Sequence, residues 1–198
     1  MSEIPRPATL SVTLCSANKG KLVEVREALP EWDVERLEAE DYPAEDGATY
    51  LDNARIKARF GRSVGPADRW MLADDSGLEL NALGGRPGVQ TARWADGRHV
   101  EQALAALAGA EDRSGRYVAE LVLLSPEGRE VRGTGVLEGS IAREPAGAGG
   151  FGFDPVFVPN GETRTVAELG DEWKALHSHR ALAAQALLAE LERAGTPS

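Results

Sequence analysis

The sequence is poor in cysteine and aromatic residues and has no long apolar run. Its 198 residues include a single cysteine, Cys15, so no disulfide can form within the chain. This usage is typical of proteins from a reducing compartment. No stretch approaches the roughly 20 consecutive apolar residues of a membrane span, and the first residues lack the apolar segment of a signal peptide. We therefore expect a cytoplasmic protein with no membrane partner.

Positive charge is also scarce. The chain has 22 Lys and Arg against 32 Asp and Glu, which gives a formal net charge of −10. Because neutralising phosphates dominates affinity for nucleic acids, we expect no nucleic-acid partner. Lysine is especially rare, with only four: Lys19, Lys21, Lys57 and Lys174. Lysine is a compact charge suited to phosphate oxygens, and all four lie in or beside the segments considered below.

The order of strand and helix patterns predicts an α/β fold. Hydrophobic residues make up 42% of the chain and charged residues 27%, as in ordinary globular proteins. The length suits a single domain over residues 1–198. Alternating or apolar runs predict strands, and 3.6-residue spacing predicts helices. Strands are expected at 9–14, 32–37, 70–73, 116–124 and 130–143, helices at 18–29, 49–64, 100–108 and 179–194, and loops at 42–47 and 84–88. This order indicates a central, largely mixed sheet with helices packed on it.

The first candidate site lies where the first strand ends and the first helix begins. Unpaired backbone N–H groups and the helix dipole favour an anion at such a junction. The segment consists of Ser16, Ala17, Asn18, Lys19, Gly20 and Lys21. Its residues could bind phosphate, although Ser and Asn also cap helices routinely. The spacing of a Walker A loop is absent.

The second candidate site combines an acidic loop with the following helix. Glu45 is a candidate metal ligand, and Lys57 is a candidate phosphate contact on the same helix face as Asn53. A solvated helix with acidic residues near its N-terminus is the alternative, because the helix dipole favours that arrangement too.

The third candidate site is the aspartate pair Asp74 and Asp75, followed by Ser76. Side chains alternate between faces along a strand, so the two carboxylates should point to opposite sides. Asp75 is expected to face metal and water with Ser76 beside it, and Asp74 to face away and brace a turn. One or two carboxylates are what Mg²⁺ takes from a protein. A turn capped by Asp and Ser is the alternative.

Two further segments contain residues that could contact a flat ring such as a nucleotide base. Glycines surround Phe151 and Phe153 in the segment 149–155, which suggests a backbone that approaches a flat ring with Phe153 stacked on it. A loop with core aromatics is the alternative. Between 174 and 180, His179 and Arg180 could donate hydrogen bonds to a nucleotide base, although a capping or surface role for His179 is also open.

Taken together, the segments resemble the Ham1-type inosine triphosphate pyrophosphatases, also called dITP/XTP pyrophosphatases. Six motifs occur in order over nearly the whole chain, and their combination is specific although each alone is weak. They are Ser16-x-Asn18-x-x-Lys21, the run from Glu45 to Ala58, Ala73-Asp74-Asp75-Ser76-Gly77-Leu78, the run from Leu83 to Arg93, Gly149-Gly150-Phe151-Gly152-Phe153-Asp154-Pro155, and Ser178-His179-Arg180.

The resemblance implies a two-lobed ITPase-like fold with a long central mixed sheet and a cleft between the lobes. It also implies a homodimer, Mg²⁺, and cleavage between the α and β phosphates. Asp75 would be the catalytic carboxylate and a metal ligand, and Glu45 a second metal ligand. Substrate would be bound by Ser16, Ala17, Asn18, Lys19, Gly20, Lys21, Lys57, Ser76, Phe151, Gly152, Phe153, Asp154, Lys174, His179 and Arg180.

The expected reaction is hydrolysis of ITP, dITP or XTP to the monophosphate and pyrophosphate. Asp75, directly or through the metal, would activate water, while lysines offset charge on the departing pyrophosphate. Arg180 or a backbone N–H would read the acceptor at the 6-position of the purine. Two alternatives remain: a Maf-like pyrophosphatase for modified pyrimidine nucleotides, and a nucleotide-binding module without turnover.

Overall fold

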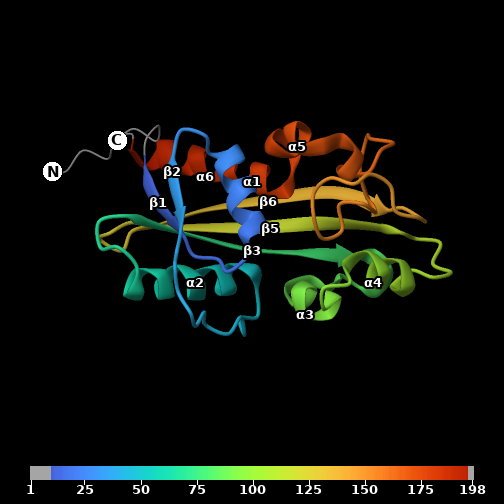
Figure 1. Cartoon of the computed structure of the whole chain (residues 1–198), viewed down its shortest axis with the longest axis horizontal. Helices are drawn as coiled ribbons and strands as arrows, with labels where there is room; N and C mark the ends of the chain where they lie inside the picture. Colours follow the sequence, from blue (N-terminus) through green and yellow to red (C-terminus); the bar gives the residue numbers. More distant parts are fainter. Residues whose placement is uncertain (1–9, 196–198) are drawn as a thin grey trace. The chain divides into compact units, whose positions relative to one another are not determined.

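The structure is a computed structural model that describes residues 10–195. The chain divides into two compact units, which are described separately here. Among the described residues, unit 1 consists of 10–75, 119–135 and 180–195, and unit 2 consists of 76–118 and 136–179. The division cuts three strands, so each unit takes part of β3, β5 and β6 (Figure 1).

The strands form one mixed sheet in the order β2-β1-β3-β5-β6-β7, with β4 paired to β3. β1 runs parallel to both β2 and β3, whereas β4 is antiparallel to β3 and β7 antiparallel to β6. The predicted mixed sheet is therefore confirmed. Thr9, where the first strand was expected to begin, lies outside the described residues. The strands are β1 Ser11–Leu14, β2 Asp33–Arg36, β3 Trp70–Leu80, β4 Arg86–Pro87, β5 Ser114–Leu124, β6 Glu130–Ile141 and β7 Phe157–Pro159.

Six α-helices accompany the described strands: α1 Lys19–Ala28, α2 Tyr50–Val64, α3 Thr91–Ala95, α4 His99–Ala106, α5 Val166–His177 and α6 His179–Gly195. The four predicted helices, now α1, α2, α4 and α6, are confirmed to within about two residues at each end. The sequence patterns did not predict α3 or α5. Among the described helices, none is long and apolar enough to cross a membrane.

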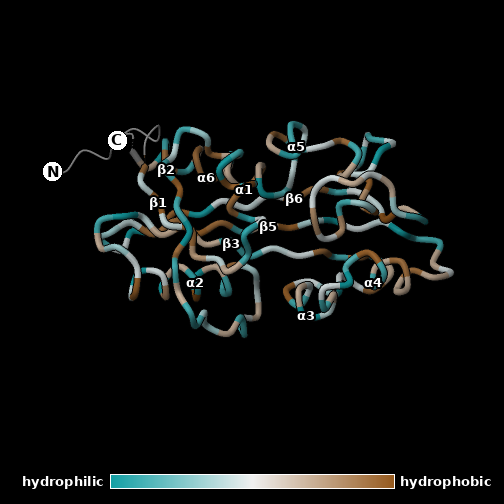
Figure 2. The backbone as a smooth tube through the Cα atoms, viewed as in Figure 1, coloured by the Kyte–Doolittle hydropathy of each residue, from teal (hydrophilic) through white to brown (hydrophobic). Residues whose placement is uncertain are grey.

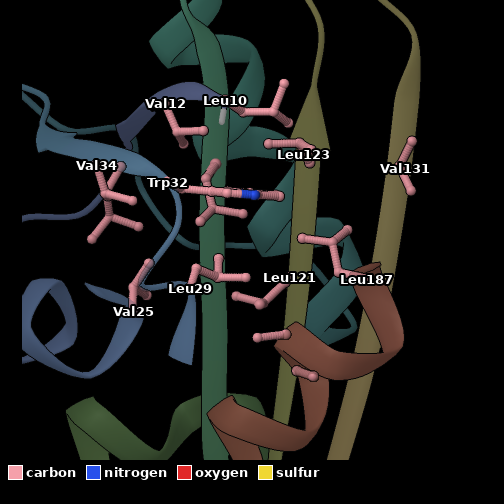
Figure 3. Packing of buried hydrophobic residues seen from close by; sticks show 14 of the residues in the cluster. Leu10, Val12, Val25, Leu29, Trp32, Val34, Leu121, Leu123, Val131 and Leu187 are labelled. Carbon is pink, nitrogen blue, oxygen red and sulfur yellow. The ribbon is translucent and has the colours of Figure 1, made fainter. Parts of the chain in front are cut away.

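In unit 1, helices cover both faces of the strands. α2 lies on one side of β1 and β3, and α1 and α6 lie on the other (Figure 1). Two clusters of buried hydrophobic residues result, the first between the strands and α1 and α6, the second between the strands and α2. Side chains alternate along a strand, so Leu72 belongs to the first cluster, whereas Met71 and Ala73 belong to the second. Figure 3 shows the first cluster, with Trp32 pointing across it towards the leucines of β5.

The single cysteine lies in the second of these clusters. Cys15 is fully buried, and burial raises the pKa of its thiol to about 12. α2 approaches it closely at Gly61, where an added Cβ would come within 2.1 Å of the Cys15 sulfur. A glycine is therefore needed at this point of α2 for the helix to pack on β1.

Unit 2 has its own core, which combines aliphatic and aromatic side chains. Leu78 and Leu80 of β3 pack with Tyr117 of β5 and with Phe153 and Phe157. Leu107, just past the end of α4, also belongs to this cluster. Hydrophobic and hydrophilic colours follow one another along the helices in Figure 2, as expected for helices with one face on a core.

Two local predictions about this part of the chain were wrong. The strand at Trp70 does not end at Ala73 but continues to Leu80 as β3, so the aspartate pair lies inside a strand. Aspartate disfavours strands because it competes for backbone hydrogen bonds, but here both side chains have ionic partners. The segment 84–88 was expected to be irregular throughout, yet Arg86 and Pro87 form β4.

Candidate active site

The predicted site residues fall into two groups, one in each unit. Unit 1 contains the strand–helix junction, Glu45, Lys57, Asp74, Asp75 and Arg180. Unit 2 contains Ser76, the glycine-rich segment with Phe151 to Asp154, Lys174 and His179. Each group has its own set of ionic or aromatic contacts, described in turn below.

The segment 16–21 joins β1 to α1 as predicted. Asn18 is the N-cap of α1, and its side-chain oxygen accepts a hydrogen bond from Gly20 N at 2.9 Å. The hydroxyl of Ser16 accepts from Asn18 N at 3.2 Å. Ala17, Asn18 and Lys19 are exposed. The junction thus has the capped helix N-terminus that the sequence predicts, and phosphate binding there stays a prediction.

Asp74 and Asp75 face opposite sides of β3, as the alternation argument predicts. Asp74 is fully buried on the side of α1 and α6, where it forms ion pairs with Lys21 and with Arg180 Nε at 2.8 Å. Arg180 also pairs with Glu24 of α1. The expectation that Asp74 braces a turn was wrong, because the strand continues and its partners are side chains from two helices.

Asp75 lies on the α2 side, where its two carboxylate oxygens have different partners. Lys57 Nζ donates to Asp75 Oδ1 at 2.8 Å, and Asn53 Nδ2 donates to Asp75 Oδ2 at 3.2 Å. Lys57 Nζ also donates to Glu45 Oε1 at 2.7 Å. The two carboxylates that were predicted to bind metal therefore converge on a single ammonium group.

Burial perturbs the charged groups in this unit. It raises the pKa of Asp75, because the carboxylate loses contact with water, and Lys57 opposes that change only partly. Burial also lowers the pKa of Lys21 against the attraction of Asp74. For Lys57, burial alone would lower the pKa, but the attraction of Asp75 and Glu45 outweighs it and the pKa is raised. Lys57 is therefore held in its charged form.

In unit 2, Asp154 organises the glycine-rich segment. Its Oδ2 atom accepts from Phe151 N at 2.8 Å and from Lys174 Nζ at 2.8 Å, and both charged side chains are buried. Lys174 Nζ also lies 4.9 Å from the centre of the Phe151 ring, a cation–π distance. Lys174, Asp154 and Phe151 therefore form one small cluster, to which Gly152 adds a half-buried backbone.

The two phenylalanines of this segment differ in exposure. Phe153, the ring expected to stack on a substrate, is only 2% exposed and packs against Trp94 and His99 in the core of unit 2. Phe151 is 40% exposed. The stacking expectation for Phe153 was therefore wrong, and Phe151 is the ring that is available to a ligand.

The two residues that were expected to read a base, His179 and Arg180, are the first two of α6 but have different partners. His179 in unit 2 is half-buried, with its ring stacked on Tyr117 at 4.6 Å and 10°. Arg180 in unit 1 is 1% exposed and bound to Asp74 and Glu24. This geometry favours an ion-pairing role for Arg180 over the predicted contact with a base. Ser76, the first residue of unit 2, is half-buried in β3.

The sequence patterns gave no role to several residues that contact the predicted ones. Asn53 had been noted only because it shares a helix face with Lys57, and the same spacing could have indicated that both contact one partner. Glu24 follows Lys21 by three residues in α1, which places both on one face. For Tyr117, no sequence signal pointed to the stack on His179.

Comparison with known proteins identifies the family. The sequence profile of the Ham1 family matches residues 12–190. A dITP/XTP pyrophosphatase from Bdellovibrio bacteriovorus is 39% identical over 196 residues, covering 92% of this chain and 98% of that protein. One from Thermus thermophilus is 42% identical, covering 95% and 94%. A HAM1 protein from Coxiella burnetii is structurally similar, with a TM-score of 0.78 at 35% identity over 93% of this chain and 99% of the other. On this evidence, the chain belongs to the Ham1 family.

Proposed function

We propose that this protein is a nucleoside triphosphate pyrophosphatase that hydrolyses ITP, dITP and XTP to the monophosphate and pyrophosphate. The observation that carries the proposal is the convergence of Glu45 and Asp75 on Lys57, in the same unit as the capped N-terminus of α1. The names of relatives about 40% identical along nearly their whole length support the same activity. The reaction would remove non-standard purine nucleotides from the nucleotide pool.

The carboxylate pair fits a magnesium ion. Glu45 Oε1 and Asp75 Oδ1 lie 2.7 and 2.8 Å from one cationic nitrogen, so both oxygens already surround a single positive charge. Within residues 10–195, no three His, Cys, Asp or Glu side chains group as a metal site. Mg²⁺ commonly takes one or two carboxylates and fills its other positions with water and substrate phosphates. When bound, Mg²⁺ would polarise phosphate oxygens as a Lewis acid.

The other predicted site residues would divide the remaining work. Asp75 would accept the proton of the attacking water, and burial raises its pKa towards the range useful for a general base. Lys21 and the backbone N–H groups of the α1 N-terminus would bind phosphate oxygens. In unit 2, Phe151 would stack on the base while His179 and the backbone supply hydrogen-bond donors.

Neither alternative is favoured by the comparisons. A Maf-like enzyme would act on modified pyrimidine nucleotides, and a binding module would need no acidic pair beside an anion site. We also propose that the protein is cytoplasmic, on its cysteine usage, and that it is a homodimer, on the family resemblance alone. Light scattering coupled to gel filtration would give twice the 21.1 kDa chain mass if the dimer forms.

The direct test is the release of pyrophosphate from ITP. We expect release from ITP, dITP and XTP in the presence of Mg²⁺, and little release after EDTA treatment. The same assay with ATP, GTP and a modified pyrimidine triphosphate covers the Maf-like alternative. Binding of ITP without any release of pyrophosphate would overturn the proposal in favour of a binding module.

Base selectivity follows from hydrogen-bond chemistry at the 6-position of the purine. Hypoxanthine and xanthine present an acceptor there, whereas adenine presents a donor. A site that donates to this position would leave buried donors unpaired with adenine, which can reduce kcat/KM by about 10⁴-fold. Comparable kcat/KM values for ITP and ATP would contradict this part of the proposal.

A further inference from the structure

Asn53 is a fully buried amide in the first turn of α2. It is 0% exposed, beside Ala54 and Lys57 on the buried face of the helix. A buried amide that lacks hydrogen-bond partners is costly, so a helix face that packs on a core normally carries apolar residues here. The partners of Asn53 therefore indicate why an amide stands at this position.

Those partners fix which way the amide points. Asn53 Oδ1 accepts from Gly47 N at 2.8 Å, and Asn53 Nδ2 donates to Asp75 Oδ2 at 3.2 Å. A backbone N–H can only donate and an ionised carboxylate can only accept, so the flipped amide would lose both bonds. Asparagine is the side chain of this length that satisfies both neighbours at once.

The first consequence concerns the Asp75 carboxylate. The terminal torsion of an aspartate is broad, so a carboxylate with one partner can rotate. Here Lys57 holds Oδ1 at 2.8 Å and Asn53 holds Oδ2, and the two donors come from a single helix, four residues apart. The plane of the carboxylate is thereby set by α2.

The second consequence concerns the loop that carries Glu45. The bond from Gly47 N ties this loop to α2, and an added Cβ at Gly47 would lie 2.7 Å from Asn53 Oδ1. Only glycine allows so close an approach. Two residues earlier, Glu45 reaches Lys57 at 2.7 Å. One amide thus holds both the loop of Glu45 and the carboxylate of Asp75.

We propose that Asn53 is a positioning residue that sets the geometry of the Glu45 and Asp75 pair for cation binding and hydrolysis. This inference rests on the proposed pyrophosphatase activity. Asn53 acts through its two neighbours, and its amide fixes where the carboxylate oxygens stand before substrate and cation arrive. Displacing a reacting group by about 1 Å can cost about 10²-fold in rate.

Two variants test the role, and a third serves as the control. Asn53→Ala removes both hydrogen bonds, whereas Asn53→Asp keeps the size and the acceptor for Gly47 but turns the donor to Asp75 into an acceptor. Ala58→Gly loosens the same buried face of α2 without touching either carboxylate. We expect both Asn53 variants to lower kcat for ITP about 10²-fold with little change in KM, and Ala58→Gly to keep kcat within about twofold.

A second readout does not depend on turnover. Binding of Mn²⁺ to the nucleotide-free protein, followed by electron paramagnetic resonance, should be about tenfold weaker in Asn53→Ala than in Ala58→Gly. Thermal unfolding of each variant identifies the temperature range in which it is folded. A wild-type protein inactive on ITP would refute the proposed function. The Mn²⁺ measurement would still show whether Asn53 positions the two carboxylates for cation binding.

The inference would be overturned by folded Asn53 variants whose kcat matches that of Ala58→Gly. Equal Mn²⁺ affinity in Asn53→Ala and Ala58→Gly would overturn it as well. If Asn53→Ala does not fold, Asn53→Asp decides at a temperature at which thermal unfolding shows it to be folded: a kcat within about twofold of that of Ala58→Gly would overturn the inference.

Discussion

The two faces of β3 in unit 1 each carry a buried aspartate, but the surroundings of these aspartates differ. On one face, Asp74 and Glu24 meet Lys21 and Arg180, so two negative charges balance two positive ones. On the other face, Asp75 and Glu45 share the single positive charge of Lys57. Asp74 is fully buried, whereas the side chain of Glu45 is 41% exposed.

This difference separates a structural ion cluster from a cation site. A balanced and buried cluster has its charges compensated and stabilises the packing of α1 and α6 on the strand. A set with an excess negative charge that reaches solvent through Glu45 favours binding of another cation. Two identical neighbouring residues can therefore serve different purposes when a strand points them in opposite directions.

The largest expected effect is on turnover by Asp75→Asn. The amide keeps the size of the side chain but cannot accept the proton of water or bind a cation as a carboxylate does. We expect kcat for ITP to fall about 10³-fold while nucleotide binding is retained. Pyrophosphate release and calorimetric ITP binding measure the two quantities, and near-normal turnover would remove Asp75 from the mechanism.

The matched variant Asp74→Asn should instead act on stability. It leaves the buried Arg180 without its full ionic partner, and breaking a buried ion pair from one side typically costs about 3–5 kcal/mol in the free energy of unfolding. Asp75→Asn should cost less, because Lys57 keeps Glu45 as a partner, whereas Asp74→Asn leaves Lys21 and Arg180 with Glu24 alone. Equilibrium urea unfolding compares the two, and equal losses would contradict the division between the faces.

Unit 2 offers a parallel pair in Phe151 and Phe153, one exposed and one buried. Phe151→Ala should raise KM for ITP about tenfold, since a base stacked on an aromatic ring is worth about 1–3 kcal/mol. Phe153→Ala should leave a cavity and lower the free energy of unfolding by about 3–5 kcal/mol. The reverse pattern in kinetics and urea unfolding would show that Phe153 contacts the base.

The smallest effect concerns pH and Lys21. Burial lowers the pKa of Lys21 from its usual value of 10.5, so its proton and positive charge are lost at a lower pH than in a free lysine. KM for ITP should therefore rise about fivefold as the pH increases towards 10. Lys21→Arg keeps its charge throughout this range and should flatten the rise. A KM that responds identically in both proteins would exclude Lys21 as the titrating group.

Regular elements and the opposite directions of the aspartates could be predicted from the sequence, because both depend on local periodicity. The extent of β3 could not, since the Asp74, Asp75, Ser76 and Gly77 run has turn composition. The strand persists there because Lys21 and Lys57 arrive from distant helices to compensate the carboxylates. Tertiary contacts of this kind override local propensity.

The expectation for Phe153 was wrong, and that for Arg180 is disfavoured, for one shared reason, which is exposure. Motif spacing indicates that Phe153 and Arg180 belong to the site region but does not indicate whether they face solvent. Phe153 is buried by rings from separate segments, such as Trp94 and Tyr117. Arg180 meets Asp74 at a separation of 106 residues along the chain. Neither contact has a signature in the local sequence.

Cys15 has a practical consequence for experiments on this protein. A thiol with a pKa of about 12 and no exposed surface is almost entirely protonated at neutral pH and unreactive towards maleimides or iodoacetamide. The native chain therefore does not react with thiol-directed labels. A single cysteine introduced at an exposed position, such as Ala17 beside the α1 N-terminus, would carry a fluorophore or spin label to that one place without removing the natural residue.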